Sequence, residues 1–164
     1  MAGPVPLLAR FASTALCQSL TSDEVDSLFE LCDKKELQAG AMLFTQGEAA
    51  DALWIVLDGD VEISREGKVL AEVGPGSALG ELSLFRSAQW RSASARAICP
   101  VTALRIPVTQ FQKRLAAFDV AALKVVNNLA HQMADRLSAL NDRIMSGGRK
   151  GLAVARSELR RVVG

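Results

Sequence analysis

The sequence predicts a mainly β domain with helices at both ends. Between residues 42 and 106, short apolar or alternating segments of strand length follow one another, and this pattern is typical of β-strands that bury one face. Glycine-containing turns separate these segments, among them Asp58-Gly59 and Gly74-Pro75-Gly76. A helical pattern lies before this region, and a long helical pattern lies after it. Short strands with glycine turns favour an antiparallel barrel or sandwich.

The elements can be placed in chain order. Residues 1–19 are an irregular or partly helical lead-in. Thr21 and Glu24 have the spacing of a capping box, which predicts a helix start with Val25 and Leu28 on its apolar face. The predicted strands are residues 42–44, 53–57, 61–64, 69–73, 92–98 and 101–106. Pro107 ends the last strand, and a short helix is predicted over residues 108–117.

One long helix is predicted over residues 120–145, because this stretch has no glycine or proline and Asp119 can cap its start. Its apolar residues recur at two heptad positions for about three heptads, which is a coiled-coil signal. They are Leu123, Ala130, Leu137 and Ile144 at one position, and Val126, Met133 and Leu140 at the other. The pattern favours a homodimer through residues 120–145; the alternative is a helix that lies on its own domain. Val125 and Leu129 lie off the seam and are expected to pack on the barrel.

Gly147-Gly148 is expected to break this helix, which leaves residues 146–164 as a tail. Residues 145–164 hold five Lys and Arg residues and one Glu, whereas the chain as a whole carries a net charge of +1. The tail is either a short basic amphipathic helix that docks on a partner or a solvated end. The small net charge argues against broad nucleic-acid binding by charge alone.

Composition places the chain among globular proteins of a reducing compartment. Its 164 residues are 49% hydrophobic and 23% charged, which suits one domain with a sizeable core. The three cysteines, Cys17, Cys32 and Cys99, form no CxxC pair and are expected to be small buried apolar residues. We expect no signal peptide and no membrane span, and therefore a cytoplasmic location.

The most informative segment is Gly80-Glu81-Leu82-Ser83-Leu84-Phe85, with Arg91-Ser92-Ala93 shortly after it. A tight turn that leads into a helical turn presents free backbone N–H groups, which attract a phosphate. Arg91 adds a planar donor fork, and Ser92 adds a hydroxyl. Glu81 can only accept, which suits a ribose hydroxyl. The combination predicts a site for a ligand that carries a ribose hydroxyl beside a phosphate.

The run GELSLFRSAQWRSASARA, residues 80–97, resembles the phosphate-binding cassette of cyclic-nucleotide-binding domains, and most of all that of bacterial catabolite activator proteins. The resemblance covers about residues 20–144 and includes Gly40, the Gly47-Glu48 turn and the corner at residues 73–76. It implies a jelly-roll barrel with an N-terminal helix and a long C-terminal helix. It also implies a regulatory receptor for cyclic AMP, with cyclic GMP as the alternative ligand, that dimerises along the long helix.

The resemblance also assigns roles to single residues. It implies that Arg91 and the N–H groups of Leu82, Ser83 and Ser92 hold the cyclic phosphate. Glu81 would accept from the ribose 2′-hydroxyl, and Gly80 would let the backbone approach closely. Leu70, Val73 and Leu79 would form an apolar wall. Trp90 either covers the phosphate or, as we favour, fills a crevice, whereas Trp54 belongs to the core.

The long helix is expected to contribute two further site residues. The resemblance implies that Arg136 lies near Glu81 and couples the site to the helix. The activators present a Thr-Ser pair to the base, but this chain has Leu140 and Asn141 at the matching positions. Asn141 can still read a base edge because it has both donor and acceptor. Ser92 favours cyclic AMP, since related sites that prefer cyclic GMP often have threonine there.

No pattern indicates enzyme chemistry or a metal site, and His131 has no expected catalytic role. The residues after the long helix are too few for the helix-turn-helix domain of the activators. The leading hypothesis is therefore a receptor that signals through its C-terminal helix to a partner protein. Two alternatives stay open: a dimeric adaptor that has lost its ligand, and a regulatory domain of a larger channel, transporter or kinase.

Overall fold

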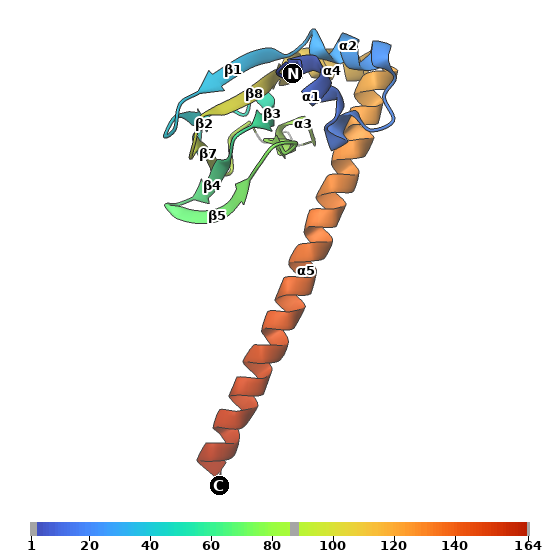
Figure 1. Cartoon of the computed structure of the whole chain (residues 1–164). Helices are drawn as coiled ribbons and strands as arrows, with labels where there is room; N and C mark the ends of the chain where they lie inside the picture. The colour runs from blue at the N-terminus through green and yellow to red at the C-terminus, as the bar shows by residue number, and fades with distance from the viewer. Residues whose placement is uncertain (1–2, 86–88, 164) are drawn as a thin grey trace. The chain divides into compact units, whose positions relative to one another are not determined.

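The computed structural model describes residues 3–85 and 89–163, with side chains up to residue 84 and from 89 to 147. The chain divides into two compact units, Met1–Leu129 and Ala130–Gly164. The first unit holds the strands and the short helices (Figure 1). The second unit is the continuation of one helix.

The first unit begins with three short helical segments, α1 Leu7–Ala12, η1 Ala15–Cys17 and α2 Ser22–Phe29. The predicted capping box at the start of α2 is confirmed. The N–H of Thr21 donates to Oε2 of Glu24 at 2.8 Å, and the N–H of Glu24 donates to Oγ1 of Thr21 at 3.2 Å. Both donors would otherwise have no acceptor at a helix start, which is why this sequence fixes the beginning of α2.

Within the described residues, the strands form two antiparallel sheets of four strands each, with the orders β1-β8-β3-β6 and β2-β7-β4-β5. Their bounds are β1 Asp33–Leu37, β2 Met42–Phe44, β3 Ala52–Asp58, β4 Val61–Arg65, β5 Lys68–Val73, β6 Ala78–Leu79, β7 Ser94–Ala97 and β8 Val101–Pro107. The predicted mainly β class with flanking helices is confirmed. β1 and β6 were not predicted, because β1 is a charged edge strand and β6 has two residues.

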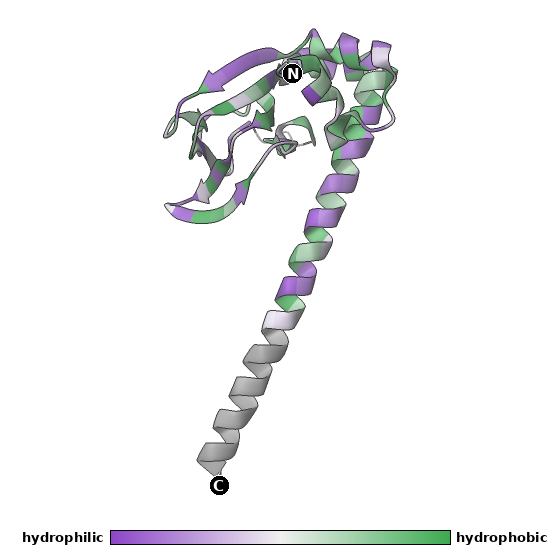
Figure 2. Cartoon of the chain, viewed as in Figure 1, coloured by the Kyte–Doolittle hydropathy of each residue, from purple (hydrophilic) through white to green (hydrophobic). Residues whose placement is uncertain are grey.

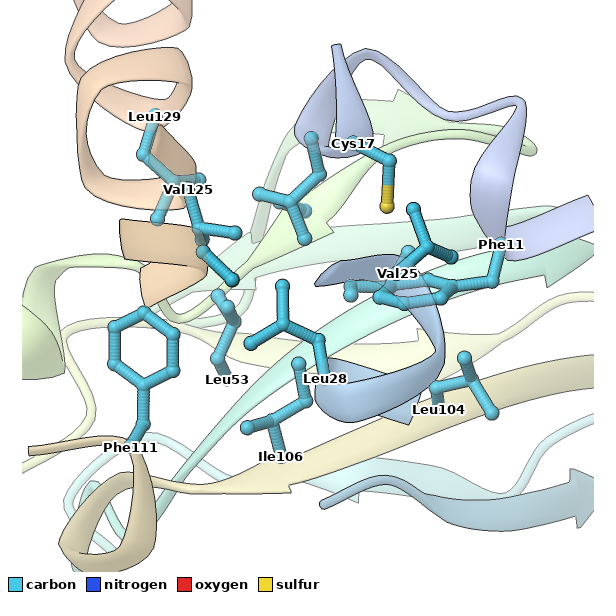
Figure 3. Close-up of a cluster of buried hydrophobic side chains, with 14 of the residues drawn as sticks. Phe11, Cys17, Val25, Leu28, Leu53, Leu104, Ile106, Phe111, Val125 and Leu129 are labelled. Atoms are coloured by element: carbon cyan, nitrogen blue, oxygen red, sulfur yellow. The ribbon is translucent and has the colours of Figure 1, made fainter. Parts of the chain in front are cut away.

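Two clusters of buried apolar side chains stabilise this unit, and β3 and β8 contribute to both. Successive residues of a strand point to opposite faces of the sheet. Leu53 and Ile55 of β3 therefore join the cluster formed with the helices, including Phe11 and Phe111 (Figure 3). Trp54, which was predicted to be in the core, joins the cluster between the two sheets. Each fully buried large side chain contributes about 1.5–3 kcal/mol.

Two more helices follow the last strand, α4 Val108–Ala116 and α5 Val120–Val163. Asp119 caps α5 as predicted, since its Oδ1 accepts from the N–H of Ala122 at 2.8 Å. The expectation that Val125 and Leu129 pack on the barrel is also confirmed, because both belong to the helix-facing cluster. The side chain of Asn128 donates to the carbonyl oxygens of Leu16 and Gln18, each at 2.8 Å.

An ion pair adds to the attachment of the first turns of α5. Nζ of Lys124 lies 2.8 Å from Oε2 of Glu24 on α2. The hydrogen bond from Lys124 and the capping bond at Thr21 hold the pKa of Glu24 below its ordinary value. The capping carboxylate of α2 thus also anchors α5.

The predicted break at Gly147-Gly148 is wrong, because α5 runs continuously from Val120 to Val163. Glycine inside a helix costs about 1 kcal/mol relative to alanine, but it ends a helix only where the backbone turns left-handed. The boundary predicted at residue 146 therefore lies inside α5. Figure 2 shows apolar residues recurring along the coloured part of this helix.

The cysteines are free in the described part of the chain. Cys17 is buried, and burial raises the pKa of Cys32 to about 12, so both thiols stay protonated and pack as apolar residues. Cys99 is half-buried, and its Sγ accepts a hydrogen bond from the N–H of Asp60 at 3.2 Å.

Candidate functional site

The candidate site is built around Arg91, whose backbone is fixed by the turn at residues 47–50. The N–H of Arg91 donates to the carbonyl of Glu48 at 2.7 Å, and the N–H of Gly47 donates to the carbonyl of Arg91 at 2.9 Å. Trp90 forms an isolated bridge with Ala49. Because this segment is extended, neighbouring side chains point in opposite directions.

This alternation buries Arg91, which is 5% exposed, and turns Trp90 outward, where it is 65% exposed. The favoured prediction for Trp90, that it fills a crevice, is wrong. The indole faces water because the pairing with the 47–50 turn points the side chain of Arg91 inward, and the neighbouring side chain of Trp90 therefore points outward.

The guanidinium of Arg91 is held from one side. Its Nη2 donates to the carbonyl oxygen of Ala52 at 2.7 Å and lies 3.5 Å from Oδ1 of Asp51. Its Cζ lies 4.3 Å from the ring centroid of Phe44, a cation–π distance. Nε and Nη1 are buried and have no hydrogen-bond partner among the described residues.

A buried guanidinium with two unpaired nitrogens is energetically unfavourable, because burial removes water without supplying acceptors. Desolvation lowers the pKa of Arg91, and the nearby Asp51 opposes that shift. Arginine remains charged even so, because its ordinary pKa lies far above neutral pH. The arrangement therefore provides a buried positive charge with free donors, which an anion with several acceptor oxygens satisfies.

Gly80 makes room for this guanidinium. Its φ of +74° favours glycine, and a Cβ at this position would overlap Nη1 of Arg91 and lie 3.2 Å from the carbonyl oxygen of Ala52. Gly80 is followed by the one-turn helix α3 Leu82–Phe85. The backbone of Gly80 thus lies beside Nη1 on the unpaired side of Arg91. The expected close approach of Gly80 to a ligand stays a prediction.

The turn after Gly80 uses one of the expected donors internally. The N–H of Ser83 donates to the carbonyl of Gly80 at 3.2 Å, and its Oγ donates to the same oxygen at 2.6 Å. Ser83 therefore stabilises the turn as well as lying beside the site. Glu81 is half-buried, Leu82 is exposed, and Ser92 is exposed next to Arg91.

The three apolar wall residues differ in position. Leu79 on β6 is buried in the cluster between the sheets, and Val73 at the end of β5 packs against that cluster. Leu70 is exposed on β5, the edge strand of its sheet. Leu79 consequently supports the site from within the core, whereas Leu70 presents its side chain to solvent.

Arg136 and Asn141 belong to the second unit, where both are exposed on α5. The described positions therefore bring together Gly80, Ser83 and Arg91, which share one unit. The roles expected for Arg136 and Asn141 stay predictions.

Sequence reasoning missed three neighbours of Arg91. Phe44 lies under the guanidinium, Asp51 lies beside it, and Arg105 on β8 binds Asp51 with Nη2 2.8 Å from Oδ2. These residues are far apart in the chain and follow no motif. The pairing of β3 with β8 brings Arg105 to the start of β3, and this register was the missing information.

Comparison with known proteins identifies the class of protein. The family model of the cyclic nucleotide-binding domain matches residues 34–118, just over half of the chain. The catabolite activator protein of Thermus thermophilus has the same fold, with a TM-score of 0.68 and 28% identity over 80% of this chain and 62% of that one. A cyclic nucleotide-binding protein of Geobacter metallireducens, at 24% identity, shares the fold with a TM-score of 0.71 over 80% of this chain and 98% of its own.

The chain belongs to the cyclic nucleotide-binding domain family and is a regulatory domain of that family. Among curated relatives, glutaminase 1 of Bradyrhizobium diazoefficiens is 33% identical over 134 residues, which are 81% of this chain and 22% of the glutaminase. The chain spans about a fifth of the length of the glutaminases it matches. The predicted family is therefore confirmed.

The residues with described positions include no group of histidine, cysteine, aspartate and glutamate side chains that could hold a metal ion. In the same part of the chain, no helix combines the length and the apolar content needed to cross a bilayer.

Proposed function

We propose that this domain is a cyclic AMP receptor, in which Arg91 binds the cyclic phosphate. The observation that carries the proposal is the buried guanidinium, 5% exposed, whose Nε and Nη1 lack partners among the described residues. A cyclic phosphate supplies one negative charge and acceptor oxygens of the required kind. Cyclic GMP is the alternative ligand, and Ser92 favours cyclic AMP through the family resemblance.

The remaining site residues have complementary roles in this proposal. Gly80 allows the ligand to approach the backbone beside Arg91. Glu81 accepts from the ribose 2′-hydroxyl, and the N–H groups of Leu82 and Ser92 add donors to the phosphate. Val73 and Leu79 support the apolar side of the site, and Asn141 reads the base.

The domain has no catalytic role in this proposal and transmits binding through α5 as a homodimer in the cytoplasm. The second unit carries Leu137, Leu140 and Ile144 exposed at heptad spacing, and such side chains are covered when two helices pair. The ligand shifts this helix only by its differential affinity for the two arrangements. A partner protein would read the change.

Titration calorimetry with cyclic AMP and cyclic GMP tests the proposal. We expect micromolar binding of cyclic AMP, which corresponds to about −8 kcal/mol. Arg91→Ala removes the phosphate partner and weakens binding by about 2–5 kcal/mol. Arg96→Ala is the matched control, because Arg96 on β7 pairs with Glu62 at the surface. Equal affinity in the parent and Arg91→Ala would place the ligand elsewhere.

A second candidate is the regulatory domain of a larger enzyme. It is favoured by the match to about a fifth of the length of two glutaminases. An antibody against the first unit, applied to extracts of the source cells, distinguishes the two. A product that migrates well above a 164-residue chain supports this second candidate, and a product of that size supports the stand-alone receptor.

A further inference from the structure

Asp51 lies between two arginines and is shared unequally. Its Oδ2 is 2.8 Å from Nη2 of Arg105, whereas its Oδ1 is 3.5 Å from Nη2 of Arg91. The first distance is that of a charge-assisted hydrogen bond, and the second is that of a loose ion pair. The carboxylate of Asp51 thus binds mainly to Arg105, which lies outside the proposed phosphate site.

The fold explains why Arg105 reaches Asp51. Arg105 lies on β8, which is the neighbour of both β1 and β3, and it pairs in register with Asp33 and Trp54. Asp51 directly precedes β3. Arg105 also has Nη1 3.5 Å from Oδ2 of Asp33, so its guanidinium is held between two carboxylates. The half-buried Arg105 is therefore fixed in position, whereas the side chain of Asp51 is 63% exposed.

We propose that Arg105 is a positioning residue of the nucleotide site, which holds the carboxylate of Asp51 and so prevents it from closing on Arg91. This inference rests on the proposed function of Arg91. Arg105 touches no ligand in this scheme. It keeps the donors of Arg91 available to an incoming phosphate.

Without Arg105, the carboxylate of Asp51 would be free to turn towards Arg91. Two nitrogens of the buried Arg91 guanidinium have no partner among the described residues, and such a group attracts any carboxylate within reach. Oδ1 of Asp51 already lies 3.5 Å from the third nitrogen, Nη2. Asp51 and Arg105 also act in opposite directions on the pKa of Arg91. Glu48 is the other acidic residue that acts on Arg91, but its Oε2 accepts from the N–H of Thr45 at 3.1 Å and is retained in its own turn.

Four proteins test the proposal: the parent, Arg105→Gln, Asp51→Asn and the double variant. Each is titrated with cyclic AMP and with cyclic GMP by calorimetry. We expect Arg105→Gln to weaken binding about tenfold, because the phosphate must displace the freed carboxylate; tenfold corresponds to about 1.4 kcal/mol. Asp51→Asn should bind at least as tightly as the parent. In the double variant the loss should disappear, leaving an affinity within about twofold of Asp51→Asn.

Two results would overturn the inference. An equal loss from Arg105→Gln in both backgrounds would mean that the charge of Arg105 acts directly on the ligand. No loss in either background would mean that Asp51 does not compete. Asp33→Asn controls for a structural role, because it removes the other partner of Arg105 and should leave the affinity within about twofold of the parent.

A ligand-free measurement separates this inference from the proposed function. The NMR signals of the Arg91 guanidinium should shift in Arg105→Gln and not in the double variant, since pairing requires the Asp51 carboxylate. If the Arg91 signals shift in Arg105→Gln but the parent binds no nucleotide, the receptor is refuted and the competition is supported. If the parent binds cyclic AMP but the Arg91 signals do not shift in Arg105→Gln, the receptor is supported and the competition is refuted.

Discussion

In the first unit, Met1–Leu129, a buried arginine has two nitrogens without partners among the residues whose positions are described. In the second unit, Ala130–Gly164, large apolar side chains face water. Each arrangement is unfavourable for the opposite reason: one lacks polar partners and the other lacks apolar cover. Each also indicates the chemistry of what is missing. In the proposed function, an anion completes the first unit and the same helix face of a second copy completes the second.

Arg91→Met is the strongest way to break this comparison. The substitution keeps much of the side-chain volume and removes the unpaired charge, so stability should stay equal to that of the parent or rise. Binding of cyclic AMP should fall by about 2–5 kcal/mol. Thermal unfolding and calorimetry on the same sample measure both. A clear loss of stability would mean that the guanidinium is satisfied in the free protein.

Leu137→Glu tests the second unit. Leu137 is 59% exposed at the middle of the heptad seam, and a carboxylate there would be buried in both copies of a paired helix. We expect association to weaken by at least about 3 kcal/mol, which light scattering at tens of micromolar reports as a change from dimer to monomer. Ser138→Glu, one residue off the seam, is the control and should remain dimeric. A monomeric parent would contradict the homodimer.

Gly80→Ala tests how the first unit makes room for its arginine. The new methyl group adds backbone strain and displaces the guanidinium, and we expect a loss of about 2 kcal/mol in nucleotide affinity. Gly76→Ala is the matched control, because Gly76 has a similar φ of +90° but nothing within 4 Å of an added Cβ. If both variants bind alike, Arg91 does not need the space beside Gly80.

Arg136→Ala tests whether the two units communicate. If Arg136 meets Glu81 in one state only, binding and the helix are coupled. The substitution should then reduce the ligand-driven change in the free energy of opening of α5 by about 1 kcal/mol, and it should reduce the binding free energy by less. Hydrogen exchange along residues 120–163, with and without cyclic AMP, measures this change. Arg143→Ala, on the same helix, should behave as the parent. Identical protection with and without ligand would show that signalling does not use the helix.

The sequence predicted those parts of the fold that follow from local rules. The capping box at Thr21, the strands between residues 42 and 106, and the cap at Asp119 each depend on neighbouring residues. β1 escaped prediction because its charged sequence shows no alternation. The helix end at Gly147 was wrong because glycine lowers helix stability without ending the helix.

In the candidate site, too, the sequence indicated the residues of one local motif but not the contacts made between distant parts of the chain. Gly80 and Arg91 were singled out because they lie in one short motif, and the structure places them side by side, whereas their contacts with a ligand stay predictions. The outward direction of Trp90 depends on pairing with a turn some 40 residues earlier. Asp51 and Arg105 meet only through the register of β3 and β8. Such contacts depend on tertiary structure and have no signature in a single sequence.

The position of Ala52 has a consequence for the rate at which the site assembles. Its carbonyl anchors Arg91, and it opens a strand in which residues 52–57 are all buried, packed on one face by helices and on the other by the second sheet. We expect a strand enclosed in this way to open only when the whole unit unfolds, so that its amides exchange most slowly. The arginine anchor is thus formed before any ligand arrives. Binding then loses little entropy on this side of the site, and association should be limited by diffusion and access and not by folding of the anchor.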